Sequence, residues 1–546
     1  MKLLAEKSKI KIGVEPDDSN SDTEQKLLQN IKDPAQMRSF YKKSVRRGCN
    51  TLLTNTKYAL KTFLKNSDDK ELFTKINHKA VEIAKNAAAS VLILGNIGSA
   101  DFTIVPFGTF GFDKAVELYQ QQARIFIEKK VDGIVLNQFS DLQNLRAAAI
   151  AVRKESGNIP LIVSADFPAE RMKSGTDIET LATIMNSLEI NSVGCNNIKL
   201  LRKLERFTSL PLVFNLNREF EKNTQRLKKR RLAIVIMDNS FLNDVEKLND
   251  NIKSKKIVKK DHKAIFKITS HAKTVAAGSG MPFFKIGERI NPTGRENLAS
   301  ELKEGKIDQV IKDARAQIAA GADALDVNVG TPMIDEKKIM VKVIRALQNK
   351  FDIPLVIDSS TPEVLEAGLG NYAGKALVNS IDGDEEKQEK ILPIVKKYGA
   401  AIIGLTIKGG KPGNAEERYE IASSIQKKCK SYGIPASDII IDTVAMSAAT
   451  SGDAGLQSFE AVRKIKEELN LPTMMGISNS SFGLPQRKWV HNTFLAQAIS
   501  HGLDGGIVNV LEPEFHKTVH TASIFAGRDA HCLNYIKYTR NLESRE

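Results

Sequence analysis

A short β-branched or aliphatic run recurs eight times in the second half of the chain, and a helical pattern follows each run. Continuous apolar runs are typical of strands buried on both faces, and strands that alternate with helices form parallel sheets. Eight such units over about 260 residues have the size of a closed (β/α)8 barrel. The expected strands are 285–290, 324–329, 355–360, 376–381, 401–406, 439–444, 473–479 and 505–510.

The first half of the chain repeats this alternation less clearly, and its first run is weak. Because 546 residues are enough for two domains, the sequence predicts an α/β protein of two tandem (β/α)8 TIM barrels. The small residues of 276–280 (AAGSG) suit a short connection, which gives expected domains of 1–275 and 281–546. The expected strands of the first barrel are 10–14, 50–55, 91–96, 133–138, 160–166, 191–197, 211–217 and 232–238.

The composition indicates which class of protein this is and where in the cell it is expected. Hydrophobic residues make up 42% and charged residues 27% of the chain, as in soluble globular proteins. No run approaches the ~18 apolar residues of a membrane span, and charges interrupt the apolar run at the N-terminus. We therefore expect a cytoplasmic protein with no membrane partner. The four cysteines lack CxxC spacing, which argues against a disulfide framework or a cysteine-rich metal site.

The formal net charge is +15, and the densest basic runs are 222–231 and 253–260. Such runs can attract an anionic partner, but they are more often solvated lysine-rich surface. No nucleic-acid motif or aromatic interleaving accompanies them, so we expect no nucleic-acid partner. His516 and His520 are four residues apart and could share a metal, but the absence of a third ligand favours an exposed helical face.

The expected strands of the second barrel end in amides and carboxylates, at the end of a TIM barrel where active sites lie. Histidine, cysteine and lysine are absent from these positions, so the set makes neither a strong nucleophile nor a metal cage. Carboxylates accept hydrogen bonds and amides both accept and donate, which suits the ring N–H and carbonyl groups of a pterin. Capping of the following helices could explain any one of these residues but explains the full ring poorly. The strand-end residues are Glu288, Asn291, Asp326, Asn328, Asp358, Asn379, Thr406, Asp442, Asn479 and Asn509.

Six motifs of the second half resemble the pterin-binding methyltransferase family. This family includes the methyltetrahydrofolate:corrinoid methyltransferases and the folate domain of cobalamin-dependent methionine synthase. Dihydropteroate synthase shares the barrel, but its usual lysine and S-x-R triplet are replaced here by SNSSFG, so that activity is not expected. The motifs are GERINPTGR (287–295), GADALDVNVGTP (321–332), IDSSTPE (357–363), VNSI (378–381), IDTV (441–444) and GISNSSFGLPQR (476–487).

The resemblance implies roles for individual residues. Asp358, Asn379 and Asp442 would hydrogen-bond the pterin ring, and Asn479 would lie beside N5 as the catalytic residue, stabilising its protonated state as charge develops. Phe482 departs from the family pattern, where a polar residue is expected. The full set of implied substrate-binding residues is Glu288, Asn291, Asp326, Asn328, Asp358, Asn379, Asp442 and Arg487.

The resemblance further implies a methyltransferase that moves the N5-methyl group between methyltetrahydrofolate and a corrinoid. A cobalamin-binding D-x-H-x-x-G motif is missing, so we expect a separate corrinoid-binding protein to carry the corrinoid. A homodimer is a further expectation. The alternatives are a methionine synthase component that uses homocysteine and a non-catalytic folate-binding or scaffold protein.

Three segments of the first half resemble the homocysteine S-methyltransferase barrel: 41–60, 76–87 and 131–148. That family binds zinc through three cysteines, one in G-x-N-C and two in G-G-C-C. Here Asn197 stands at the first position, and Asp238 and Asn239 stand at the second, so no zinc is expected. The family's DGAMGT opening is also missing, and Asn137-Gln138 replaces its E-T pair. We therefore expect a degenerate or repurposed barrel.

Overall fold

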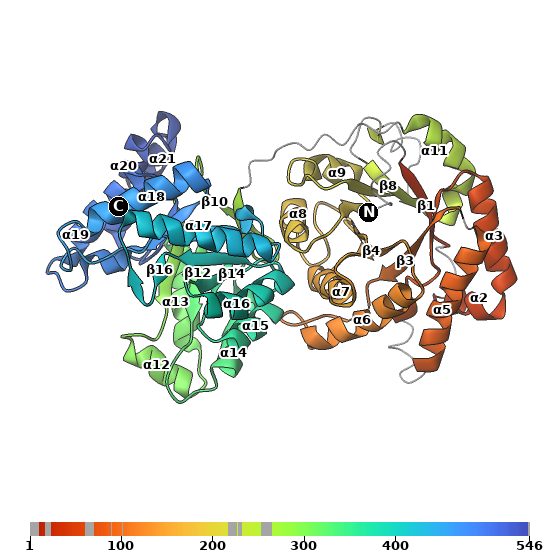
Figure 1. Ribbon diagram of the computed structural model, residues 1–546, viewed down its shortest axis with the longest axis horizontal. Coiled ribbons are helices and arrows are strands. Elements are labelled where there is room, and N and C mark those ends of the chain that lie inside the picture. The colour runs from red at the N-terminus through yellow and green to blue at the C-terminus, as the bar shows by residue number, and fades with distance from the viewer. Residues whose placement is uncertain are drawn as a thin grey trace. The chain divides into compact units, whose positions relative to one another are not determined.

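The chain folds into two compact units, Met1–His262 and Lys263–Glu546, each with one closed barrel of eight parallel strands (Figure 1). The predicted pair of (β/α)8 barrels is therefore confirmed. A computed structural model describes residues 10–16, 23–60, 70–88, 90–100, 102–216, 226–227, 232–252 and 265–543. The basic run 253–260, and all of 222–231 except residues 226–227, lie outside this description.

The first barrel closes where β1 pairs with β8, with Lys11 opposite Ile234. The weak first run is thus a true strand. Apolar side chains that include Leu94, Val135 and Ile162 fill the interior. The strands are β1 (Lys11–Val14), β2 (Thr51–Leu53), β3 (Leu92–Gly98), β4 (Gly133–Phe139), β5 (Leu161–Ala165), β6 (Ser192–Cys195), β7 (Leu212–Leu216) and β8 (Leu232–Met237). The helices are α2 (Thr23–Lys32), α3 (Pro34–Arg46), α5 (Lys70–Ala87), α6 (Phe112–Glu128), α7 (Leu142–Glu155), α8 (Ile178–Ser187), α9 (Ile198–Leu204) and α11 (Val245–Asn251).

The second barrel closes where β11 pairs with β20, with Ile286 opposite Ile507. Its strands are β11 (Phe284–Ile290), β12 (Ala324–Asn328), β13 (Leu355–Asp358), β14 (Leu377–Ile381), β15 (Ala401–Leu405), β18 (Ile439–Asp442), β19 (Thr473–Gly476) and β20 (Gly505–Val508). The expected strand 473–479 is too long, because the backbone turns into the 3-10 helix η4 (Ile477–Ser481) after Gly476.

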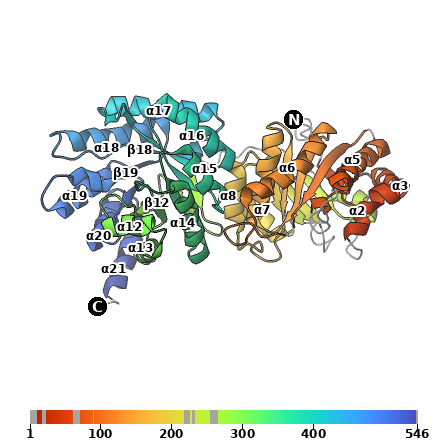
Figure 2. The ribbon, with the colours of Figure 1, turned by 90° about the horizontal axis from the view of Figure 1, so that it is seen from below.

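Helices surround the strands of the second barrel (Figure 2). Residues with known capping roles lie at the ends of two of these helices. Asn414 and Glu417 form a capping box at the start of α17, and Gly399 ends α16 with a φ of 62°, which glycine adopts without steric cost. No helix among the described residues has the length and apolar character needed to cross a membrane. The helices are α12 (Glu296–Lys303), α13 (Asp308–Ala319), α14 (Glu336–Lys350), α15 (Pro362–Gly370), α16 (Glu385–Tyr398), α17 (Ala415–Ser431), α18 (Ala454–Lys464), α19 (Arg487–Ser500), α20 (Pro513–Phe525) and α21 (Leu533–Glu543).

A β-hairpin precedes β11 and belongs to the second unit. Its strands are β9 (Phe266–Thr269) and β10 (Thr274–Ala277), and Phe266 and Ile268 lie in the same buried cluster as the interior residues of the barrel. Thr269 exchanges backbone hydrogen bonds with Lys375, just before β14, so the hairpin covers the N-terminal end of the barrel. The units therefore divide between residues 262 and 263, and not at the small-residue stretch 276–280 where the sequence suggested a linker. Phe266 and Ile268 are two residues apart on β9 and so lie on one face of the strand, which is the apolar face of the hairpin.

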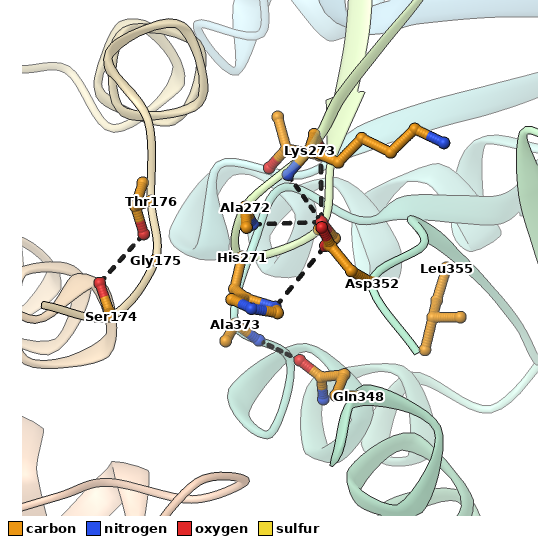
Figure 3. A network of polar contacts seen from close by, with 12 residues as sticks. Ser174, Gly175, Thr176, His271, Ala272, Lys273, Gln348, Asp352, Leu355 and Ala373 are labelled. Atoms are coloured by element: carbon orange, nitrogen blue, oxygen red, sulfur yellow. Dashed lines mark hydrogen bonds and ion pairs between the residues drawn. The ribbon is translucent and has the colours of Figure 1, made fainter. Parts of the chain in front are cut away.

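The turn of this hairpin is fixed to the barrel by polar contacts (Figure 3). Ser270 donates its hydroxyl to Asp352 and accepts the backbone N–H groups of Ala272 and Lys273 at 3.2 and 2.9 Å. His271 lies 3.8 Å from the same Asp352 carboxylate. These contacts hold the hairpin at the end of the barrel opposite to the strand ends that carry the polar residues.

Candidate functional site

Three neighbouring strands place one polar residue each at the same level. Asn328 of β12 is in register with Asp358 of β13, which is in register with Asn379 of β14. Adjacent strands lie about 4.8 Å apart, so these side chains are within reach of one another. The Asn328 amide donates to the Asp358 carboxylate at 2.9 Å. We call these residues, together with Asp326, the polar row.

Asp326 lies two residues before Asn328 and so on the same face of β12, one level deeper. It is only 3% exposed, and it accepts a hydrogen bond of 3.3 Å from the Asn379 amide. Burial, followed by the charge of Asp358, raises the pKa of Asp326 well above its ordinary value. Burial also raises the pKa of Asp358. Two carboxyl groups whose ionised forms disfavour each other can share a proton, so the row can donate as well as accept.

Asp442 ends β18 and is held in a different way. Its carboxylate accepts the backbone N–H of Val444 at 2.7 Å. Val444 has a φ of 59°, an unusual conformation for a β-branched residue that costs of order 1–3 kcal/mol. Arg418 of α17, fully buried, donates to the carbonyls of Thr443 and Val444 at 2.9 and 3.0 Å and so fixes this turn. Burial raises the pKa of Asp442 to about 7, although the Val444 N–H and Arg418 oppose the shift.

Glu288 of β11 meets the segment that follows β19. Ser478 donates its hydroxyl to the Glu288 carboxylate at 3.0 Å, and burial raises the pKa of Glu288. Arg487, at the start of α19, donates to the Ser478 carbonyl at 2.7 Å and to the Ser481 hydroxyl at 3.0 Å. His491, one turn further along α19, also hydrogen-bonds the Ser478 carbonyl, at 3.2 Å.

A cavity of ≈ 310 Å³ lies beside Glu288, and Ser478, Arg487, His491 and Asn509 contribute to its wall. The volume is at the lower end of the range for small-molecule sites. The polar row does not line this cavity. Glu288 links the two, because its charge contributes to the raised pKa of Asp326.

Two of the predicted residues stand apart from these contacts. Asn291 follows β11, and its side-chain oxygen accepts the Thr293 N–H at 2.9 Å, so it shapes a turn. Asn479 lies on η4 with an exposed side chain whose carboxamide forms no hydrogen bond within the described part of the chain. It is therefore open to a ligand.

Three residues of this region were not among the sequence predictions: Arg418, Ser478 and His491. Ser478 lies inside the SNSS motif, so its position was a usable signal. Arg418 lies 25 residues before the Thr443 carbonyl that it contacts, and His491 lies on a helix 13 residues after Ser478. No local pattern distinguishes either of them from a surface residue of its helix.

The positions at which zinc ligands are expected in the first barrel act as helix caps. Asn197 accepts the N–H groups of Lys199 and Leu200 at 3.1 and 3.4 Å, and Asp238 accepts that of Ser240 at 2.8 Å. Cys195 is fully buried, and burial raises the pKa of its thiol to about 12. A neutral amide, a capping carboxylate and a protonated thiol do not suit zinc. Across the described residues, no three His, Cys, Asp or Glu side chains gather as a metal site.

The mouth of the first barrel holds an internal polar network. Lys57 pairs with Glu15 at 3.4 Å and donates to the Gln138 side chain at 2.5 Å. Asn137 donates to Glu15 at 2.6 Å and accepts from Asn215 at 3.0 Å. Glu15 and Lys57 are 2% and 8% exposed, so these groups largely satisfy one another.

Two closed parallel barrels, the second with clustered carboxyl and carboxamide groups at its strand ends, define a tandem-barrel α/β protein built to act on a small molecule. Residues 7–287 match the family model for homocysteine S-methyltransferase, and residues 287–509 match that for pterin binding enzyme. The chain belongs to the homocysteine S-methyltransferase family and carries a pterin-binding domain after it. Both resemblances seen in the sequence are confirmed, and the chain is a methyltransferase with these two domains.

Solved structures similar to each half are known. The metallated homocysteine methyltransferase MmuM from Escherichia coli is 14% identical, with 44% of this chain and 96% of that chain covered and a TM-score of 0.39. The dihydropteroate synthase of Yersinia pestis is 19% identical, with 47% and 98% covered and a TM-score of 0.37. The 7,8-dihydropteroate synthase of Vibrio fischeri ES114 is 16% identical, with 47% and 97% covered and a TM-score of 0.37.

Proposed function

We propose that the second barrel binds a reduced folate and moves the N5-methyl group between methyltetrahydrofolate and a corrinoid carried by a separate protein. The observation that carries the proposal is the pairing of carboxyl groups of raised pKa with carboxamides in the polar row, together with the raised pKa of the buried Asp442 carboxyl. A pterin presents N–H donors beside ring nitrogen and carbonyl acceptors. Carboxyl groups of raised pKa, which can donate when protonated, and carboxamides, which both donate and accept, match such a ring.

Each part of the site has a task in this proposal. The polar row and Asp442 bind and orient the pterin ring. Asn479, with its free carboxamide, stabilises the protonated N5 from which the methyl group leaves, because a nitrogen anion is a very poor leaving group. The reduced corrinoid supplies the nucleophile. The remaining work of the barrel is to position the substrate and to polarise N5.

The test is a methyl-transfer assay on the full chain. Methyltetrahydrofolate and free cob(I)alamin are mixed with the protein, and methylcobalamin formation is followed by its absorbance. We expect transfer above the uncatalysed rate, together with saturable folate binding. Folate binding without transfer, also when a corrinoid protein is supplied, would favour the folate-binding or scaffold alternative.

The second candidate function is homocysteine methylation, which the family match of residues 7–287 favours. The roles of Asn197 and Asp238 as helix caps weigh against it, since zinc activates the homocysteine thiol in this family and these side chains suit zinc poorly. Formation of methionine from homocysteine separates the two candidates.

A further inference from the structure

A second cavity of the pterin-binding unit, of ≈ 260 Å³, lies beside the start of β11 and helices α20 and α21. Lys285 lines it near the start of the strand, whereas Glu288 lines the other cavity further along. The two cavities have no lining residue in common. The cavity beside α20 and α21 is therefore separate from the candidate folate site, and nothing in the proposed methyl transfer uses it.

The wall of this cavity is rich in cations. Lys285, Arg528 and Lys537 line it against a single carboxylate, that of Asp529. Both Asp529 oxygens are occupied, since they accept the N–H groups of Asn534 and Tyr535 at 2.9 Å each at the start of α21. The lining residues therefore carry three cations and one carboxylate, and Asp323 and Asp504, which do not line the cavity, pair with Lys285 and Arg528.

The cations differ in how firmly they are held. Arg528 donates to the Leu503 carbonyl at 2.6 Å and lies 3.6 Å from Asp504, so it is structural. Lys285 faces Asp323 at 3.4 Å. Lys537 is exposed and has no ion pair or hydrogen bond within the described part of the chain. Lys537 is therefore able to turn toward an incoming anion, whereas Lys285 would have to exchange or share its contact with Asp323.

Two half-buried imidazoles complete the wall. His516 hydrogen-bonds the Val510 carbonyl through Nε2 at 2.8 Å. His520 stacks on Tyr538 with ring centroids 4.3 Å apart, and its ring nitrogens make no hydrogen bond to any described residue. Burial lowers the pKa of both, and the charge of Lys285 adds to the effect for each. An anion between the two imidazoles would oppose the effect of the Lys285 charge on their pKa values.

A metal is a poor occupant for the two histidines. The positive charge of Lys285 acts on both imidazoles and repels a cation from the same space, and no group of three possible metal ligands gathers among the described residues. An oxyanion matches better, because lysine and imidazole N–H groups are its usual donors. The apolar sides of Tyr538 and Val519 leave room for an organic portion.

We propose that this cavity binds a small phosphate monoester, with Lys285, Lys537 and His520 around the phosphate and Tyr538 against the organic group. Phosphate is favoured over carboxylate because its second negative charge matches two lysines at once, while a neutral His520 can still donate one N–H. The volume lies below the range of about 300–1,000 Å³ typical of drug-sized ligands, so the ligand is small.

The test uses the full chain and two probes, phenyl phosphate and inorganic phosphate, in calorimetric titrations. We expect saturable binding of one phenyl phosphate per chain, tighter than that of inorganic phosphate. The variants Lys537→Gln and His520→Gln should each weaken phenyl phosphate binding about tenfold. Lys517→Gln is the matched control, since Lys517 is an exposed lysine of α20 that pairs with Glu514 and does not line the cavity.

Four results would overturn the proposal. Absence of saturable binding up to about 10 mM of either probe would exclude a site. An equal loss in Lys517→Gln would show diffuse attraction to a basic surface. Equal affinity for the two probes would exclude an organic ligand. Displacement of phenyl phosphate by methyltetrahydrofolate would place the probe in the candidate folate site. Unchanged melting temperatures of the variants keep these results interpretable.

Discussion

Asp326 and Asp358 lie on adjacent strands of the second barrel, and the charge of Asp358 helps to raise the pKa of the buried Asp326 carboxyl. Each also accepts a carboxamide N–H, Asp326 from Asn379 and Asp358 from Asn328. The carboxamides therefore hold the two carboxyl groups in place, while burial favours their protonation. Such a pair holds a proton at higher pH than ordinary surface aspartates do, so it can offer both a donor and acceptors.

Stability should depend on pH through Asp442. Burial raises its folded-state pKa from 3.8 to about 7, so the folded state holds the proton more tightly than the unfolded state. This contribution to stability is fully present below about pH 4 and is lost as the pH rises through about 7. The side chain of the Asp442→Asn variant cannot ionise, so the variant will not lose this stability as the pH rises. Relative to the unaltered protein, the variant should gain about 1.4 kcal/mol per unit of pKa shift between pH 4 and pH 8.

The measurement is urea unfolding of both proteins at the two pH values. The comparison cancels the groups that both proteins share, including Asp326 and Asp358. If the free energy of unfolding changed equally with pH in both proteins, ionisation of Asp442 would not destabilise the folded state.

Asp442→Ala and Asn479→Ala should affect different steps. The first variant loses a hydrogen-bonding group that the pterin contacts throughout, so folate affinity should fall about 10- to 100-fold. The second loses a group that acts as N5 gains charge, so the single-turnover methyl-transfer rate should fall about 100-fold with little change in affinity. Asn349→Ala, on the outer helix α14, is the control. An unchanged single-turnover rate in Asn479→Ala would remove that residue from the mechanism.

The second unit should fold and bind methyltetrahydrofolate without the first barrel, since every proposed pterin contact comes from its own strands. The fragment 263–546 should bind as the full chain does, followed by the fluorescence of Trp489, the only tryptophan. The fragment 285–546 lacks the hairpin, and Phe266 and Ile268 alone bury side chains worth about 1.5–3 kcal/mol each. It should melt at a lower temperature. Equal melting temperatures would show that the hairpin does not seal the barrel.

The purified protein should contain no stoichiometric zinc and should not make methionine from homocysteine, even with methylcobalamin. The physical reason is the replacement of thiolates by Asn197, Asp238 and Asn239, because thiolate-rich sites gain about 10–16 kcal/mol from zinc that these side chains cannot supply. Elemental analysis after dialysis gives the zinc content. One tightly bound zinc per chain, with methionine formed in proportion, would instead support the methionine synthase alternative.

Cysteine restored at those three positions is not expected to rescue the activity. The mouth of the first barrel also contains the network of Glu15, Lys57 and Asn137, whose side chains fill one another's hydrogen-bonding capacity. If restored cysteines did rescue methionine formation, the side chains of this network would have to exchange their internal hydrogen bonds for contacts with a ligand.

The amino-acid sequence by itself determined the two barrels and the polar strand ends. Alternation of apolar runs with amphipathic helices is a local property, and parallel strands necessarily bring their carboxyl ends to one face. Positions such as Asn328, Asp358 and Asn379 could therefore be placed at one end of the barrel from their place in each run. The motifs that resemble the pterin-binding methyltransferase family then indicated the class of ligand, a pterin.

Only the tertiary structure decided which of these groups meet and in what state. Hydrogen bonds such as that of Ser478 to Glu288 join residues 190 apart in the chain, and no local pattern specifies them. The same holds for Arg418 and for the hairpin at β9 and β10, whose apolar face has a partner only when the barrel has closed. The raised pKa of Asp442 depends on burial, which is a property of everything packed around the carboxyl group and not of its neighbours in sequence.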